Sequence, residues 1–230
     1  MKVCIIPARG GSKIIPKKNI KDFCGKPMIS WTINAAINSQ CFDKIIVSTD
    51  SEEISSISKN FGAEVPFLRP KNISDDHTGT IPVISHAINF INNNIGVVDY
   101  ACCIYATAPF VEPCFITKGL EKILQLNANY CFSATSFPFP IQRAIKIKSN
   151  GRSEMFYPEN FNIRSQDLQK SFHDAGQFYW GKSSSWLDNK RIFDDDSIPI
   201  LIPRYKVQDI DDIEDWERAE ILFEIINKLK

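Results

Sequence analysis

The chain has 230 residues, enough for one α/β domain with a modest excursion, and its 43% hydrophobic and 23% charged residues are ordinary for a globular protein. Lys and Arg together number 27, as do Asp and Glu, so the formal net charge is zero and a generic nucleic-acid-binding role is disfavoured. No segment approaches the ~20 apolar residues of a membrane span, and the seven cysteines lack CxxC spacing. We therefore expect a cytoplasmic protein with reduced thiols that binds neither nucleic acid nor a membrane.

Strand-like and helix-like segments alternate over the first 135 residues. Short apolar runs predict strands, and apolar residues three or four positions apart predict helices. The predicted strands cover residues 2–6, 44–49, 99–105, 129–136 and 198–203, and the predicted helices cover residues 26–39, 51–62, 80–93, 112–127 and 211–230. This order indicates a mostly parallel sheet with helices on both faces, in which ligands bind at the carboxyl ends of the strands.

The pattern changes at about residues 137–182, which have a proline-rich start, many aromatic residues and a turn signal at Asn150-Gly151. Short amphipathic runs on either side of that turn predict a β-hairpin. We therefore interpret residues 1–230 as a single domain with an excursion at residues 137–182.

A glycine-rich basic loop, "IPARGGSKIIPKKN" at residues 6–19, follows the first predicted strand. Its glycines and cations are Arg9, Gly10, Gly11, Lys13, Lys17 and Lys18. Exposed backbone N–H groups beside Lys and Arg suit a phosphate-bearing ligand. The loop fits neither the P-loop pattern GxxxxGK[ST] nor the dinucleotide pattern GxGxxG. A solvent-exposed basic turn is the alternative interpretation.

Two carboxylates in the last quarter of the chain, Asp209 and Asp211, flank Ile210. In an extended segment this spacing places both carboxylates on one face while Ile210 points into the core. Two oxygen ligands on one face suit Mg²⁺, which takes further ligands from water and phosphate. The competing interpretation is that Asp211 or Asp212 caps the final helix.

The basic loop closely resembles the N-terminal motif of the cytidylyltransferases that activate sialic acids and related nine-carbon sugar acids. The similarity extends along nearly the whole chain, through "LRPKNISDDHTGT" at residues 68–80, "IYATAPFV" at residues 104–111 and "VQDIDDIEDWERAE" at residues 207–220. The resemblance implies a Rossmann-like nucleotidyltransferase fold of the glycosyltransferase-A type. That fold is a three-layer sandwich with a mostly parallel sheet and a small hairpin-bearing excursion for dimerisation.

Two positions depart from the sialic-acid pattern: Ile14 stands where Gly is common, and Tyr105 stands where Gln is found. The segment "HDAGQFYWG" at residues 173–181 resembles the subfamily that uses pseudaminic acid. That sugar has a more apolar tail than sialic acid. We expect an aromatic wall to receive the tail, formed by Tyr105, Phe178, Tyr179 and Trp180.

The resemblance also implies a role for individual residues. CTP binding is implied for Arg9, Gly10, Gly11, Ser12, Lys13, Lys18, Asn19, Arg69 and Thr80. Catalysis is implied for Arg9, Lys18 and Asp211, and Mg²⁺ binding for Asp209 and Asp211. Sugar-acid binding is implied for Tyr105, Arg143, Arg164, Gln177 and Tyr179. The implied reaction transfers CMP from CTP to the 2-hydroxyl of the sugar acid, within a homodimer whose excursions reach toward the partner's sugar pocket.

Three other functions stay open. They are activation of a different ulosonic acid (sialic, legionaminic or Kdo-type), nucleotidyl transfer to a pterin or polyol phosphate, and nucleotide binding without turnover. Pterin and polyol phosphate enzymes usually carry an AGGxSxRMG-type loop, whose Arg-Met-Gly is missing here. A module without turnover is expected to lack an intact acidic pair. For single residues, Arg69 as a surface arginine and Thr80 as a helix N-cap are the alternatives.

Overall fold

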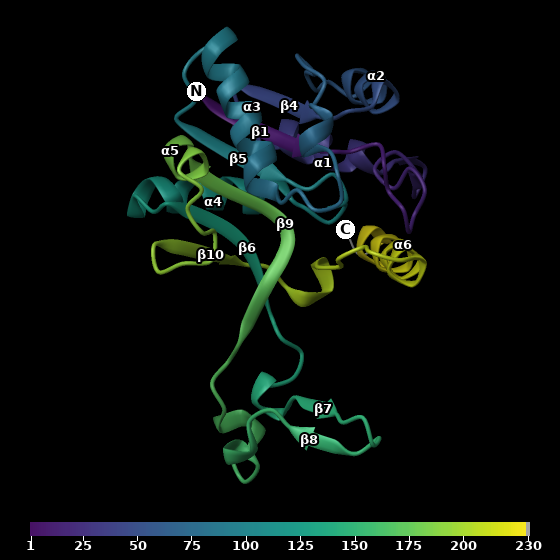
Figure 1. Cartoon of the computed structure of the whole chain (residues 1–230), viewed down its shortest axis with the longest axis vertical. Coiled ribbons are helices and arrows are strands. Elements are labelled where there is room, and N and C mark those ends of the chain that lie inside the picture. Colours follow the sequence, from purple (N-terminus) through teal and green to yellow (C-terminus); the bar gives the residue numbers. More distant parts are fainter. Residues whose placement is uncertain (229–230) are drawn as a thin grey trace.

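The central sheet of the computed structural model has the strand order β10-β6-β9-β5-β1-β4 (Figure 1). The structure describes residues 1–228. The strands are β1 (Lys2–Pro7), β4 (Lys44–Ser48), β5 (Tyr100–Ile104), β6 (Tyr130–Ser136), β9 (Phe172–Lys182) and β10 (Ser197–Leu201). Strand β9 runs antiparallel to both of its neighbours, whereas the other pairings in this sheet are parallel. The prediction of a mostly parallel sheet is therefore confirmed.

Five α-helices of the described residues follow the predicted segments to within a few residues, whereas the short helix α5 has no predicted counterpart. The helices are α1 (Met28–Ser39), α2 (Glu52–Asn60), α3 (Thr80–Asn94), α4 (Pro113–Leu126), α5 (Ser183–Leu187) and α6 (Ile213–Lys228). A small two-stranded ladder, β2 (Asp22–Phe23) with β3 (Lys26–Pro27), precedes α1. The predicted end of the last helix at residues 229–230 lies outside the described residues. None of the helices within residues 1–228 is both long and apolar enough to cross a membrane.

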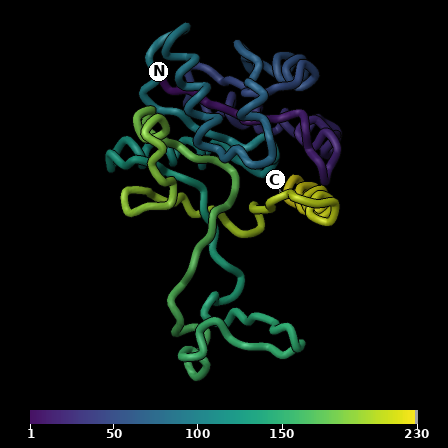
Figure 2. The backbone as a smooth tube through the Cα atoms, viewed as in Figure 1, coloured from purple at the N-terminus to yellow at the C-terminus, as the bar shows by residue number. Residues whose placement is uncertain are grey.

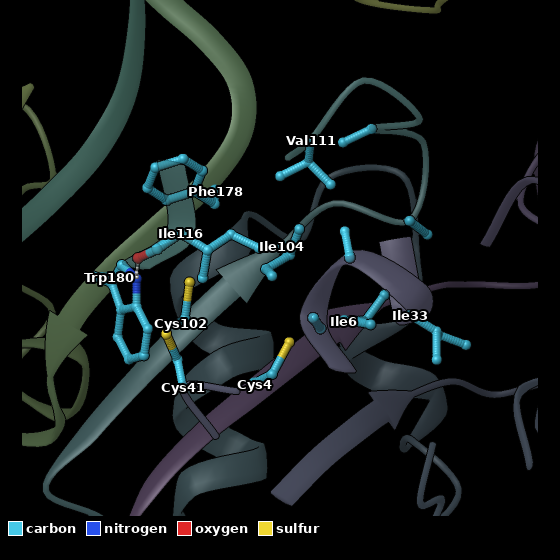
Figure 3. Packing of buried hydrophobic residues seen from close by; sticks show 14 of the residues in the cluster. Cys4, Ile6, Ile33, Cys41, Cys102, Ile104, Val111, Ile116, Phe178 and Trp180 are labelled. Carbon is cyan, nitrogen blue, oxygen red and sulfur yellow. Dashed lines mark hydrogen bonds between the residues drawn. The ribbon is translucent and has the colours of Figure 1, made fainter. Parts of the chain in front are cut away.

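The sheet has a buried core on each face, because side chains alternate along its strands. Cys102 packs with residues of α1, α2 and α4 on one face, whereas its neighbour Cys103 packs with residues of α3 and α5 on the other. Figure 3 shows the first of these clusters, where the Nε1–H of Trp180 donates to the carbonyl of Ile116 at 2.9 Å. Helices therefore cover both faces of the sheet.

The excursion is shorter than predicted. It contains the expected hairpin of β7 (Ile145–Ile147) and β8 (Ser153–Met155), with Gly151 at a positive φ of 78° in the turn. The chain leaves the sheet after β6 and returns through β9, the long strand in Figure 1 that Figure 2 traces as one continuous tube. Strand β9 pairs with β6 and β5 from Phe172 onward, so the excursion comprises residues 137–171 and the predicted limit at residue 182 is wrong.

The predicted aromatic wall is wrong for three of its four members. Phe178 and Trp180 are fully buried against the α1 and α4 face of the sheet, and Tyr179 is buried on the opposite face. The reason is that a strand between two paired neighbours sends alternate side chains into both layers of the core. Only Tyr105 of the proposed wall lines a cavity.

Candidate functional site

A cavity of about 490 Å³, here called the loop cavity, opens at the carboxyl ends of β1 and β5. All the predicted CTP-binding residues line it except Gly10 and Gly11, and Tyr105 and Asp211 line it as well. The carboxyl ends of parallel strands lie at one edge of the sheet, which explains why segments far apart in the sequence meet there. The structure therefore brings the basic loop, residues 69–80 and the acidic pair to one place.

The two adjacent lysines of the basic loop have different partners. Lys17 has a positive φ of 53°, and its Nζ lies 2.8 Å from Glu53 on α2. The Nζ of Lys18 donates to the carbonyl of Ile210 at 2.6 Å and lies 3.6 Å from Asp211 Oδ1. Lys18 therefore connects the basic loop to the acidic pair, whereas Lys17 stays outside the loop cavity.

Hydrogen bonds within the loop and to Asp50 hold the remainder of the loop. The N–H of Gly10 donates to Asp50 Oδ1 at 2.8 Å, and Asn19 Nδ2 donates to the carbonyl of Arg9 at 2.9 Å. An added Cβ on Gly10 would approach Ser51 Cβ to 3.1 Å, so glycine allows the close approach of the loop to the start of α2. These contacts give Gly10 and Asn19 a clear part in shaping the loop.

Asp76 is a residue of the loop cavity that the sequence patterns do not predict. Its carboxylate forms ion pairs with both Arg9 and Lys13. The hydrogen bonds from Lys13 and Arg9 lower the pKa of Asp76 below its usual value. A carboxylate between two cations occupies the kind of position that a phosphate group suits. The separation of 67 residues between Arg9 and Asp76 hides this pairing from any local pattern.

Arg69 is buried, with 6% of its surface exposed, so the interpretation as a surface arginine is wrong. Its backbone N–H donates to Thr49 at 2.7 Å. Within residues 1–228, the Nε and Nη2 atoms of its guanidinium have no hydrogen-bond partner. Burial lowers the pKa of Arg69, as does nearby Arg9, while Asp50 opposes the change. An unpaired, buried guanidinium lining a cavity is well suited to an anionic or carbonyl-bearing ligand.

The burial of the residue between the two aspartates is as their spacing predicts. Ile210 is fully buried between the two aspartates, and burial together with nearby Asp211 raises the pKa of Asp209. The capping role belongs to Asp212, whose Oδ1 accepts from the N–H of Asp215 at 2.9 Å. The cap at the start of α6 therefore does not depend on Asp211, whose side chain is 75% exposed.

A magnesium ion fits this pair on the chemistry of the donors. In the described part of the chain no cluster of three or more His, Cys, Asp or Glu side chains could hold a metal. Mg²⁺ is commonly held by only one or two carboxylates, with substrate phosphates completing its ligands. Asp209 and Asp211 supply such a set beside the cations of the loop cavity.

A second cavity of about 480 Å³ adjoins the first and is here called the bulge cavity, because residues of β9 beside the irregular register between β6 and β9 line it. Asp174, Gly176, Asp209 and Tyr105 line it, so Tyr105 belongs to both cavities. The hydroxyl of Tyr105 lies 2.8 Å from Thr80 Oγ1 in the loop cavity. The site therefore offers two adjoining compartments, one cationic and one beside the acidic pair.

The other predicted sugar-binding residues lie elsewhere. Gln177 and Tyr179 are 3% and 2% exposed, and Gln177 Nε2 donates to the carbonyl of Lys206 at 2.6 Å. Arg143 and Arg164 lie on the excursion, where Arg143 donates to Ile163 and Arg164 Nε donates to Asp167 at 2.9 Å. Neither arginine lines the loop cavity or the bulge cavity of its own chain.

Known proteins resemble this chain over most of its length. A family model described as "Cytidylyltransferase" matches residues 3–171. The chain is 45% identical over 223 residues to a pseudaminic acid cytidylyltransferase of Campylobacter jejuni serotype O:2, covering 97% of this chain and 96% of the relative. It is 29% identical to the CMP-N,N'-diacetyllegionaminic acid synthase of Legionella pneumophila, over 97% of this chain and 96% of the relative.

A solved structure supports the same fold. The CMP:2-keto-3-deoxy-manno-octonic acid synthetase in complex with CTP superposes with a TM-score of 0.72 at 14% identity, over 97% of this chain and 98% of that one. The predicted nucleotidyltransferase fold is therefore confirmed. On its sequence and its fold, the chain belongs to the cytidylyltransferase family.

Proposed function

We propose that the protein transfers CMP from CTP to the 2-hydroxyl of a nonulosonic acid, releasing pyrophosphate, and that its acid is pseudaminic acid. The observation that carries the proposal is the junction at Tyr105, where a cationic cavity meets a second cavity beside the acidic pair. A reaction between a nucleoside triphosphate and a sugar acid needs two such adjoining compartments. The cytoplasm, which holds the cell's CTP, is where we expect the reaction.

The cations of the loop cavity bind the triphosphate. Arg9 and Lys13 exchange the Asp76 carboxylate for phosphate oxygens, and Lys18 neutralises charge near Asp211. Arg69 directs its unpaired N–H groups toward the nucleotide. Charge develops on the bridging and leaving oxygens during phosphoryl transfer, so these pre-positioned cations stabilise the transition state.

In the transfer, the sugar's 2-hydroxyl oxygen bonds to the α-phosphorus of CTP while the bond to pyrophosphate breaks, and the hydroxyl proton passes to solvent water. Mg²⁺ held by Asp209 and Asp211 would neutralise phosphate charge and lower the pKa of the attacking hydroxyl. Asp209 lines the bulge cavity and Asp211 lines the loop cavity, so the pair belongs to both substrate compartments. The side chains thus bind and orient the substrates without a covalent intermediate.

Pseudaminic acid is favoured over other sugar acids by the relatives. Identity is 45% with the C. jejuni pseudaminic acid enzyme, against 29% with the legionaminic acid enzyme. Tyr105 supports the same choice, because it places an aromatic ring at the junction where sialic-acid enzymes have a glutamine.

We further propose a homodimer in which the excursion completes the partner's site. Phe139, Ile147 and Phe161 on the excursion are 78%, 77% and 65% exposed, and a second copy would cover such apolar side chains. Arg143 and Arg164 would then bind the carboxylate of the sugar acid in the partner's bulge cavity, where a guanidinium pairs well with a carboxylate.

The activity is tested by incubating the protein with CTP, Mg²⁺ and pseudaminic acid and following the products by ³¹P NMR. We expect pyrophosphate and a CMP-sugar phosphodiester to appear together, and neither to appear without the acid. Pyrophosphate release that does not depend on any nonulosonic acid would contradict the proposal.

The shared site is tested with two variants that we expect to be inactive, Asp211→Asn and Arg143→Ala. Their dimers are dissociated, mixed and allowed to reassociate. In a symmetric dimer with shared sites, each mixed dimer has one intact site, so about a quarter of the wild-type activity should return. Each variant mixed with itself is the control. An inactive mixture, or a wild-type monomer in sedimentation equilibrium, would contradict the shared site.

A further inference from the structure

The acidic pair lies in a segment without regular secondary structure. A short 3₁₀ helix, η5 (Arg204–Lys206), ends before it and α6 begins after it, so residues 207–212 belong to no helix or strand. The buried side chain of Ile210 fixes the midpoint between the two aspartates. The direction of each carboxylate also depends on the backbone to either side of Ile210. In this segment, side chains rather than neighbouring strands have to supply partners for the backbone polar groups.

One side chain, that of Asp215, holds the second half of the segment. It lies in the first turn of α6, and its Oδ2 accepts from the backbone N–H groups of Asp211 at 3.0 Å and Asp212 at 3.3 Å. The neighbouring Trp216 is 2% exposed and packs against Phe23, with ring centroids 5.4 Å apart. A helix whose first turn is anchored in the core therefore presents Asp215 to the acidic pair.

Gln208 holds the first half of the segment and is joined to Asp215. A side-chain amide nitrogen has two protons to donate. Nε2 of Gln208 donates to the carbonyl of Asp209 at 2.7 Å and to Asp215 Oδ1 at 3.0 Å, so both protons are used. Gln208 and Asp215, here called the clamp, thus connect the carbonyl of Asp209 to the N–H of Asp211.

The residue between the aspartates has side-chain partners as well. The N–H of Ile210 donates to Asp209 Oδ1 at 3.0 Å, and the carbonyl of Ile210 accepts from Lys18 Nζ at 2.6 Å. Together with the clamp, these bonds give a side-chain partner to four successive backbone groups, from the carbonyl of Asp209 to the N–H of Asp211. The backbone that carries the acidic pair is therefore held at each of these groups.

We propose that Gln208 and Asp215 are positioning residues for the metal, which keep the carboxylate of Asp209 at the bulge cavity and that of Asp211 at the loop cavity. The inference rests on the proposed function, because Mg²⁺ at the acidic pair is part of that function. Groups that orient the ligands of a metal commonly contribute about 10- to 100-fold to its affinity. Asp215 itself lines neither cavity, and both of its oxygens already accept hydrogen bonds, so it acts through Asp211.

Helix capping is the competing role for Asp215. Asp212 Oδ1 accepts from the N–H of Asp215 at 2.9 Å, and Asp215 Oδ2 accepts from the N–H of Asp212, which is the reciprocal pattern of a capping box. A cap needs one acceptor oxygen at each of the two positions, and an amide supplies one as a carboxylate does. The bond from Gln208 is not part of a cap. Isosteric amide variants therefore separate the two roles.

Three variants of nearly unchanged shape test the clamp. Asp215→Asn keeps one oxygen for the backbone N–H groups but turns an N–H donor toward Gln208 Nε2, which breaks the clamp. Gln208→Met removes both bonds of the amide and leaves every charge in place. Asp212→Asn is the matched control, because it removes one charge from the same segment and keeps the acceptor oxygen of the cap.

The quantity to measure is the gain in CTP affinity that Mg²⁺ provides when no sugar acid is present. Calorimetry gives the Kd for CTP in Mg²⁺ and again in EDTA, and the gain is the ratio of the two values. We expect Asp215→Asn and Gln208→Met each to lower the gain about tenfold. The Kd in EDTA should change by less than about twofold, because the cations of the loop cavity are unaffected.

The double variant should lose no more of the gain than either single variant, because side chains in one hydrogen-bond network are non-additive. Asp212→Asn should keep the wild-type gain. A wild-type gain in Asp215→Asn and Gln208→Met would overturn the inference. A loss in Asp215→Asn that Gln208→Met does not share would assign the effect to charge alone and would overturn it as well.

Asp209→Asn, which removes a ligand of the metal, separates failure of the inference from failure of the proposed function. We expect it to abolish the gain. If it does so while both clamp variants keep the gain, only the inference fails. A gain that survives Asp209→Asn would remove Mg²⁺ from the acidic pair, and the metal site of the proposed function would fail together with the inference.

Discussion

Replacement of Arg69 by methionine should make the free protein more stable while weakening its binding of CTP. The guanidinium is 6% exposed, and within the described residues its Nε and Nη2 atoms have no partner, while Arg9 adds a like charge nearby. A buried donor left unpaired costs about 1–3 kcal/mol. Methionine keeps the length and apolar stem of the side chain without that cost.

The stability and the affinity should therefore change in opposite directions. A gain of about 1–3 kcal/mol raises the Tm of a chain of this size by roughly 2–12 °C. Hydrogen bonds to a charged group contribute about 1.5–3 kcal/mol, so the Kd for CTP should rise about 10- to 150-fold. Thermal unfolding with and without CTP, combined with calorimetric titration, measures both quantities. An unchanged Kd would refute the reasoning, because Arg69 would then have no ligand to pair with.

Three further predictions concern the charges around the loop cavity. Asp76→Asn should lower the Kd for CTP by roughly threefold at low salt, because the carboxylate competes with phosphate for its two cations. Lys18→Ala should weaken CTP binding or slow transfer in the same titrations and assays, whereas Lys17→Ala should have little effect because Lys17 pairs outside the cavity. Asp209→Asn and Asp211→Asn should each lower kcat about 100-fold or more, measured by pyrophosphate release, with the fold retained.

Controls exist for each of these changes. Glu53→Gln removes an ion pair of the same loop outside the cavity, and it should leave the Kd for CTP unchanged. Asp212→Asn should affect the start of α6 rather than turnover. Equal effects of the two lysine variants would indicate a diffuse basic surface. Near wild-type turnover in both aspartate variants would leave the acidic pair without a catalytic role.

Most of the sheet and the helices could be predicted, because they follow from local periodicity. Two examples are the placement of Cys102 and Cys103 on opposite faces of the sheet and the burial of Ile210. Each follows from the pattern of the residues directly beside it in the sequence. The basic loop was also recognisable, since its residues are contiguous.

The central place of β9 could not be predicted in the same way. It pairs with strands only after an excursion, and its partners lie far away in the sequence. The same holds for contacts within the site. Asp76 meets Arg9 across 67 residues, and the bulge between β6 and β9 has no periodic signature. Long-range contacts and strand irregularities decide these features.

The central claim is the transfer of CMP to pseudaminic acid. It is tested most directly by kcat/KM for pseudaminic acid and N-acetylneuraminic acid, measured side by side at saturating CTP and Mg²⁺. A site that leaves polar groups of the wrong sugar unpaired rejects that sugar strongly, so we expect a preference for pseudaminic acid of about 100-fold or more. An equal rate with the two acids, or a preference for N-acetylneuraminic acid, would contradict the claim.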